Sequence, residues 1–358
     1  MIRYLAHKAF YALLTLFGVI TVIFLLFNVL PGDPAQMMLG QNEDSTQLAI
    51  VKQKYGFDKP LSTQYLYYLN DLSPVSLHSK DNSNYTYLRP GKYSHATLFS
   101  IGNTTTVLKF PYLRESFTKQ GKNVSQVIGE TLPNTFVLAV SAIVIAIIIG
   151  ILLGIVSALF KDRWLDKGIQ IFSTLGMSVP SFFSAILFAW LFGYVLHKYT
   201  NLEMTGSLYE LDDFGETVSI QWKNLILPAI VLGIRPLAVV IQLMRNSLLE
   251  VFNQDYIRTA RAKGLSEFQI IKKHAVKNAL NPVVTAISGW FASMLAGAVF
   301  VEYIFGWNGL GKEIVNALNT LDLPVIMGSV LIIALVFIII NIFVDIIYVW
   351  LDPKVKLQ

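Results

Sequence analysis

The chain has no cysteine and few charged residues. With no cysteine in 358 residues, it can form neither a disulfide nor a thiolate metal site. Charged residues make up only 14% of the chain, apolar residues make up 54%, and the mean hydropathy is +0.54. A soluble protein of this length rarely has such values. The composition therefore indicates an integral membrane protein.

Motifs of enzymes are missing as well. The five histidines are scattered, and there is no His-Glu-x-x-His, nucleophile elbow or cluster of metal ligands. Residues 306–313 have the spacing of a phosphate-binding loop, but Glu313 replaces the Ser or Thr that binds magnesium, and no strand is expected before the segment. We therefore expect no catalytic residue, no metal site and no ATPase activity in this chain.

Six apolar stretches are long enough to cross a bilayer, at about 20 residues each. They cover approximately residues 9–30, 132–160, 169–196, 225–244, 283–305 and 325–351. The first is long for a signal peptide and has no small-residue cleavage site, so we expect it to be retained. Gly150 and Gly154 predict close helix packing, as do Gly289, Ser293 and Gly297, and Pro180 predicts a kink.

Lysine and arginine predict the orientation, because they concentrate in cytoplasmic loops. With both termini inside, the short outside loops hold only Lys198, Lys223 and Lys312. The inside segments hold Arg3, Lys8, Lys161, Arg163, Lys167, Arg245, Arg258, Arg261, Lys263, Lys272, Lys273, Lys277, Lys354 and Lys356. Topology thus accounts for the net charge of +5 and the pI near 9.1, and we expect no nucleic-acid partner.

Residues 253–282 form a basic segment on the inner side. Asn253 or Asp255 could cap a first short helix, and Gly264 could end it in a left-handed conformation. Ser266 and Gln269 have capping-box spacing for a second helix, which Asn281-Pro282 is expected to close. One interpretation is a basic amphipathic loop that lies on anionic lipid. The ordered run Ala-Arg-Ala-Lys-Gly-Leu favours a docking element instead.

This segment resembles the cytoplasmic coupling loop of ABC importer permeases of the dipeptide, oligopeptide and nickel branch. The matching residues are Asp255, Tyr256, Arg258, Thr259, Ala260, Arg261, Ala262, Lys263, Gly264 and Leu265, followed by Ser266. Other parts of the chain are similar to the same branch in order: Pro31-Gly-Asp-Pro34, residues 55–61 with Gln64 and Tyr65, residues 127–135, residues 302–311, Asp322-Leu-Pro324, and Asn341, Asp345, Tyr348, Asp352 and Pro353.

The resemblance implies an all-α integral membrane protein with six transmembrane helices of the ABC type I importer permease architecture. It divides into a first helix (1–30), a large external segment (31–130) between helices 1 and 2, a five-helix core (131–351) with the coupling loop at 245–282, and a cytoplasmic tail (352–358). Residues of about 71–110 look like an insertion into the external segment.

The resemblance also implies partners and a location. The chain would pair with a homologous permease, two cytoplasmic ABC ATPase subunits and an external substrate-binding protein, in a bacterial or archaeal cytoplasmic membrane. It would hold no cofactor, since ATP and magnesium would bind the ATPase subunits. Peptides are the first expectation for the cargo, and nickel or another chelated ion is the alternative.

Three polar residues in the spans are candidates for the substrate pathway: Arg235, Gln242 and Asp345. Arg235 lies about 16 Å along the fourth span by helical rise, near the bilayer midplane. An arginine at this depth needs a partner or water, so it either lines a pathway or pairs inside the bundle with a carboxylate or a carbonyl freed by Pro236. Asp345 has the same two interpretations, with its position near the cytoplasmic end favouring a structural role.

Two other classes of protein remain open from the residues alone. A secondary transporter or channel would favour inverted repeats and intramembrane carboxylates, of which only Asp345 is found. A membrane scaffold for a cytoplasmic enzyme is the third possibility. ATP dependence of uptake and copurification of ATPase subunits would separate all three.

Overall fold

The computed structural model describes residues 2–29, 35–36, 45–82, 84–88, 94–211 and 217–351. The chain forms two compact units. The first contains residues 131–315 and both ends of the chain, and the second contains residues 11–130 and 316–334. The Pro31-Gly-Asp-Pro34 motif and the expected tail at 352–358 lie outside the described residues.

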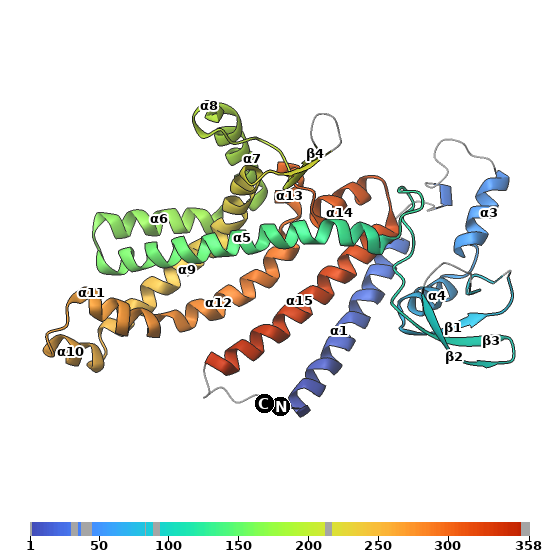
Figure 1. The fold of residues 1–358 in the computed structure, drawn as a ribbon, viewed down its shortest axis with the longest axis horizontal. Coiled ribbons are helices and arrows are strands. Elements are labelled where there is room, and N and C mark those ends of the chain that lie inside the picture. Colours follow the sequence, from blue (N-terminus) through green and yellow to red (C-terminus); the bar gives the residue numbers. More distant parts are fainter. Residues whose placement is uncertain are drawn as a thin grey trace. The chain divides into compact units, whose positions relative to one another are not determined.

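Four helices are long and apolar enough to cross a membrane, and two bent helix pairs bring the number of possible spans to six within the described residues. The long helices are α1 (Ile2–Val29), α5 (Val124–Leu159), α9 (Lys223–Phe252) and α15 (Leu323–Leu351), all labelled in Figure 1. The helical fold class is confirmed. The expected spans at 169–196 and 283–305 are bent pairs and not straight helices.

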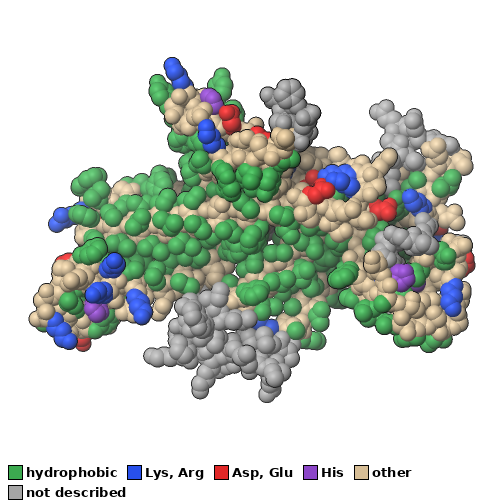
Figure 2. All heavy atoms as spheres, in the orientation of Figure 1, with side chains coloured by type: hydrophobic (Ala, Val, Ile, Leu, Met, Phe, Trp, Pro, Cys, Tyr) green, Lys and Arg blue, Asp and Glu red, His purple; other side chains and the backbone are tan. Residues whose placement is uncertain are grey.

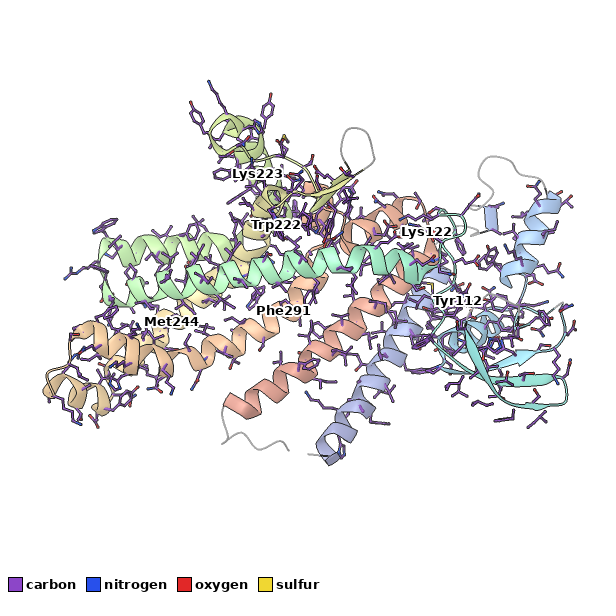
Figure 3. All side chains as sticks on the ribbon, in the orientation of Figure 1. Tyr112, Lys122, Trp222, Lys223, Met244 and Phe291 are labelled. Atoms are coloured by element: carbon purple, nitrogen blue, oxygen red, sulfur yellow. The ribbon has the colours of Figure 1, made fainter. Side chains whose placement is uncertain are left out.

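In the first unit, α6 (Trp164–Ser178) and α12 (Val276–Gly297) pack against α9, and α5 packs against it as well. Close packing at Gly150 and Gly154 is confirmed. A Cβ on Gly154 would lie 2.6 Å from the Cβ of Met244 on α9, which is labelled in Figure 3, and a Cβ on Gly150 would lie 2.7 Å from Val240. At Gly289 the expectation is wrong, since no described atom lies within 4 Å of a Cβ built there.

The kink at Pro180 is confirmed and is sharp. Val179 is extended, as the residue before a proline tends to be, and the chain turns by 110° between α6 and α7 (Ser181–Phe188). The path continues through a π-helical segment, η1 (Ala189–Val195), and the short α8 (His197–Thr200). A two-stranded hairpin follows, with β4 (Tyr209–Leu211) antiparallel to β5 (Val218–Ile220).

The second bent pair joins α12 to α13 (Val299–Phe305) at 57°, and Gly306 then ends α13 with φ = +69°. Glu302 is fully buried and accepts hydrogen bonds from the backbone N–H groups of Gly311 and Lys312 at the start of α14 (Leu310–Asn319). A Cβ on Gly309 would lie 2.4 Å from the Glu302 carboxyl, so the glycines of the 302–311 motif make room for this carboxylate. The motif is therefore a structural unit.

The second unit adds an element that the sequence did not predict. Besides α3 (Ser45–Tyr55) and α4 (Leu61–Leu72), it contains a three-stranded antiparallel sheet of order β1-β3-β2. The strands are β1 (Val75–Ser79), β2 (His95–Ile101) and β3 (Thr104–Lys109), and they lie inside the segment that we expected to be an insertion. That segment is therefore a folded sheet within the part of the chain that the structure describes.

Candidate functional site

The basic segment folds into two short helices around a glycine, as the sequence predicts. Helix α10 (Asp255–Ala262) ends before Gly264, which has φ = +78°. Helix α11 (Glu267–Ile270) begins with a complete capping box: Ser266 Oγ accepts from the Gln269 N–H, and Gln269 Oε1 accepts from the Ser266 N–H. The left-handed Gly264 and the Ser266 cap are confirmed.

Two details of this prediction are wrong. Gln254, and not Asn253 or Asp255, occupies the cap position of α10, and it makes no side-chain cap bond. The second helix does not close at Asn281-Pro282 either. It continues through a π-helical turn, η2 (Ile271–Ala275), into α12, with Pro282 inside that helix. Packing explains the second error, because Ala279 and Val283 on either side of the proline are buried against α9, which keeps the helix intact.

The inner face of the helix pair is anchored in the membrane-spanning core of the first unit. Ile257 and Ala260, one helical turn apart on α10, are buried with Ile270 of α11 in a cluster that includes Met244 and Leu248 of α9. Arg261 forms an ion pair with Glu267 at 2.9 Å, which joins α10 to α11 across Gly264. A push on the pair therefore reaches α9 and α12 directly through packed side chains.

The outer face of the pair α10 and α11 is exposed and carries most of the residues predicted for the coupling loop. Ala260 is buried and Leu265 is half-buried, and the other predicted residues are exposed: Asp255, Tyr256, Arg258, Thr259, Arg261, Ala262, Lys263, Gly264 and Ser266. Phe268 is 72% exposed beside them. Figure 2 shows Lys and Arg side chains gathered over this end of the first unit. The surface combines cations with an exposed aromatic ring, as a protein-docking surface does. We call this outer face of residues 255–268 the coupling surface.

A buried ion pair behind the coupling surface was missed from the sequence. Arg245 of α9 donates from Nε and Nη2 to the two carboxylate oxygens of Asp166 on α6, at 2.8 and 2.6 Å. Asp166 also accepts from Ser157 Oγ of α5 at 2.5 Å. The Asp166 side chain is only 3% exposed and that of Arg245 18%. Three helices are thus tied together where α9 leads into α10. The two residues are 79 positions apart, so no local pattern indicates the pair.

Arg235 lies at a cavity of about 190 Å³ within the first unit. The cavity is bounded by the break between α6 and α7 at Val179 and Ser181, and by Trp290 and Ser293 of α12. Among the described residues Arg235 makes no hydrogen bond or ion pair, and its side chain is exposed. Among the described residues of this chain, Arg235 therefore does not pair with a carboxylate or a carbonyl, as the structural alternative required.

The other two pathway candidates are not brought to this cavity. Gln242 is half-buried two helical turns further along α9, and it is not among the residues that line the cavity. Asp345 belongs to α15, but its side chain lies outside those that the structure describes. The cavity is therefore lined by one of the predicted pathway residues and by several that the sequence did not indicate for a pathway, such as Trp290 and Ser293.

The fold is that of a multi-pass membrane protein with an exposed, basic pair of short helices between two of its spans. The profile of the family "Binding-protein-dependent transport system inner membrane component" matches residues 146–357, and the profile of the N-terminal part of such components matches residues 1–83. The chain belongs to this family of permease subunits. It is therefore the permease component of a binding-protein-dependent transport system.

Curated relatives span the whole chain. It is 32% identical to the dipeptide transport system permease protein DppB of Bacillus subtilis (strain 168), over 100% of this chain and 99% of the relative. It is also 32% identical to the di/tripeptide transport system permease protein DppB of Pseudomonas aeruginosa (strain UCBPP-PA14), over 100% of both chains. A solved structure of the MetNI methionine ABC transporter in an inward-facing conformation matches with a TM-score of 0.49 and 15% identity, over 64% of this chain and 97% of that chain.

Proposed function

We propose that this chain is one permease subunit of an ATP-driven importer of di- or oligopeptides. It would form the translocation path with a second, homologous permease and would be driven by two cytoplasmic ATPase subunits that bind ATP and magnesium. An external binding protein would deliver the peptide. The names of the two relatives reported above support the cargo, because one is a dipeptide and the other a di/tripeptide transport system permease protein.

The observation that carries the coupling role is the coupling surface itself. The coupling surface is exposed in this chain, while the inner face of the pair α10 and α11 is buried in a cluster with residues of α9 and α12. ATP can drive transport only if an ATPase favours one permease conformation over the other, and it needs a contact that senses that difference. A surface packed directly onto two spanning helices can transmit such a bias.

We further propose that Arg235 contacts the cargo. An unpaired guanidinium at a cavity attracts a carboxylate and repels a free metal cation. A peptide has a terminal carboxylate, so the cavity suits a peptide better than it suits uncomplexed nickel. Both termini would lie in the cytoplasm, and the segment between α1 and α5 would lie outside, in accordance with the distribution of lysine and arginine.

The test is uptake by the whole complex in proteoliposomes with ATP inside. We expect accumulation of a radiolabelled dipeptide that depends on ATP and on the binding protein, and no competition by nickel ions. Accumulation driven by an ion gradient without ATP would contradict the proposal. ATP-dependent transport of nickel with no effect of added peptides would contradict the peptide cargo but would agree with an ATP-driven importer.

A further inference from the structure

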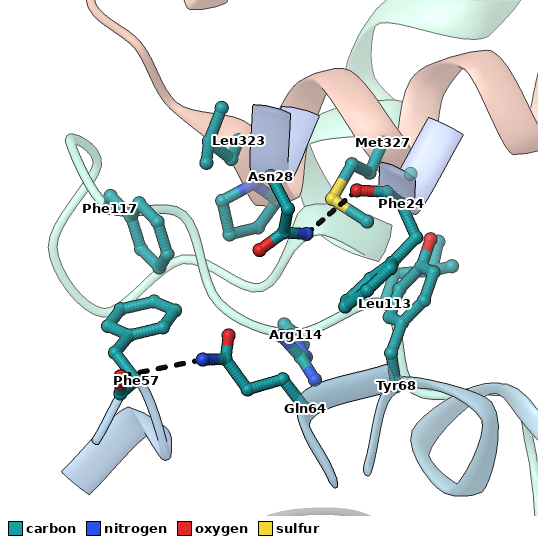
Figure 4. A pocket seen from close by; sticks show the side chains of 12 residues that line it. Phe24, Asn28, Phe57, Gln64, Tyr68, Leu113, Arg114, Phe117, Leu323 and Met327 are labelled. Carbon is teal, nitrogen blue, oxygen red and sulfur yellow. Dashed lines mark hydrogen bonds between the residues drawn. The ribbon is translucent and has the colours of Figure 1, made fainter. Parts of the chain in front are cut away.

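A second cavity, in the second unit, lies where two of the spanning helices meet the external segment. It is lined by Phe24 and Asn28 at the end of α1, by Leu323 and Met327 at the start of α15, and by Arg114 of the external segment (Figure 4). Asn28 is the last residue of the first candidate span and Leu323 is the first residue of the last one. The cavity therefore lies at the level where a bilayer's hydrocarbon gives way to its headgroups.

Arg114 brings hydrogen-bond donors to this cavity. Its Nε donates to Asp71 at 2.9 Å, and its side chain is 19% exposed. Neither of its terminal nitrogens, Nη1 and Nη2, has a hydrogen-bond partner among the residues that the structure describes. Tyr85 also donates to Asp71, at 2.7 Å. Burial raises the pKa of the Tyr85 phenol well above its usual value of 10.0, so it remains a donor and holds Asp71 in place.

Two amide oxygens face the same space. Asn28 uses its Nδ2 to bond the Phe24 carbonyl at 2.7 Å, and Gln64 uses its Nε2 to bond the Lys59 carbonyl at 2.8 Å. These bonds fix the orientation of both amides and leave Asn28 Oδ1 and Gln64 Oε1 as acceptors, which Figure 4 shows directed toward the open centre. The site therefore offers the two terminal nitrogens of Arg114 as donors and two amide oxygens as acceptors.

The walls of the cavity are aromatic and apolar. Phe57 and Phe117 stand edge to face with ring centroids 6.0 Å apart, and Tyr68 lies under the Arg114 guanidinium. The cavity volume is about 40 Å³, so only small polar groups can enter it and a whole peptide cannot. Val22, Leu25 and Leu26 lie on a different face of α1 from Phe24 and Asn28, are each about half exposed or more, and would lie against acyl chains.

We propose that this cavity binds the headgroup of a phospholipid of the outer leaflet, with the phosphodiester on the Arg114 terminal nitrogens and a headgroup ammonium on Asn28 Oδ1 and Gln64 Oε1. Arginine binds phosphate through two parallel bonds, and amide oxygens accept from an ammonium that carries N–H groups. Phosphatidylethanolamine has both features. Phosphatidylcholine has the phosphodiester but no N–H donor, so it should bind more weakly.

The experiment is native mass spectrometry of the whole transporter complex, titrated with phosphatidylethanolamine or phosphatidylcholine. We expect the wild type to prefer phosphatidylethanolamine. Arg114→Lys keeps a cation beside Asp71 but loses the fork, and it should weaken binding of both lipids about tenfold. Asn28→Leu removes one acceptor and only a bond to its own helix, so it should fold normally and reduce the preference for phosphatidylethanolamine.

Asn341→Leu is the matched control, because Asn341 makes the same bond to a carbonyl four residues earlier, at 2.8 Å, outside this cavity. It should bind both lipids like the wild type. The proposal would be overturned if the wild type bound the two lipids equally and neither Arg114→Lys nor Asn28→Leu changed the binding of either lipid. Displacement of the lipid by millimolar dialanine would also overturn it, since the site would then take a free zwitterion. Neither result depends on the cargo or on ATP-driven uptake.

Discussion

Replacing Gly264 by valine should uncouple ATP hydrolysis from transport. Gly264 has φ = +78°, a conformation that costs an L-residue about 1–2 kcal/mol and a β-branched residue more. No described atom lies within 4 Å of a Cβ built there, so the substitution strains the backbone without a clash. The strain can be relieved by rotating residues 263–266, which breaks the bond from the Leu265 N–H to the Ala260 carbonyl and the Ser266 capping box.

The magnitude follows from that strain. Helix α10 is held by Ile257 and Ala260, so α11 and the turn should move while α10 stays in place. A penalty of 1–2 kcal/mol lowers the population of the present arrangement by a factor of about 5 to 30. We expect the rate of ATP-driven uptake by Gly264→Val to decrease by a factor in this range, and we expect that substrate no longer stimulates ATP hydrolysis. Gly264→Asn should retain more activity, because asparagine tolerates the left-handed region.

The assay is uptake and substrate-stimulated hydrolysis by the whole complex in the same proteoliposomes. Gly121→Val is the matched control, since Gly121 has φ = +75°, equally open surroundings and a place in the segment between α1 and α5. It should leave coupling unchanged. Wild-type values of both activities in Gly264→Val would refute the argument that this turn transmits the ATPase signal.

Three further substitutions test other parts of the structure. Asp166→Ala leaves Arg245 partly buried without its partner and should destabilise the complex by about 3 kcal/mol in thermal unfolding. Asp255→Ala, which breaks only the exposed pair with Arg258, should cost less than about 1 kcal/mol. Equal losses of stability in the two variants would contradict this difference. Arg235→Ala should lower peptide uptake without preventing assembly or basal hydrolysis, and unchanged uptake kinetics would remove Arg235 from the pathway. Gly154→Leu should prevent the close packing of α5 on α9 and reduce the yield of folded complex. Gly289→Leu, at an open position, should leave the yield unchanged. A normal yield of Gly154→Leu would show that the two helices can separate there.

Local rules predicted the turn of the coupling loop well. The left-handed Gly264 and the Ser266 capping box depend on neighbouring residues alone, so the sequence specifies them. The predicted end at Pro282 failed because burial of Ala279 and Val283 against α9 outweighs the proline. A local signal therefore decides structure only where no tertiary packing opposes it.

Features that depend on distant contacts could not be predicted. Asp166 and Arg245 meet only after α6 and α9 have packed together, and the cavity at Arg235 forms only because the chain bends by 110° at Pro180. The sheet β1-β3-β2 was missed because the alternation in β1 is inverted, with Ser76 and His78 buried and Val75 and Leu77 exposed. In addition, β2 is exposed along its whole length. Hydropathy placed the spans, and Pro180 indicated the bend in one of them, but nothing in the sequence indicated the bend of 57° between α12 and α13.

The claim that the coupling surface receives an ATPase subunit can be tested most directly by cysteine crosslinking. The chain has no cysteine of its own, so a single introduced thiol is unique. Lys263→Cys, on the coupling surface, should crosslink to a copurified ATPase subunit with a yield that changes on addition of ATP. Lys80→Cys, at an exposed position in the segment between α1 and α5 that we propose to lie outside, should give no such product. Absence of any ATPase subunit from the purified complex, or a crosslink to it from position 80 and not from 263, would contradict the account.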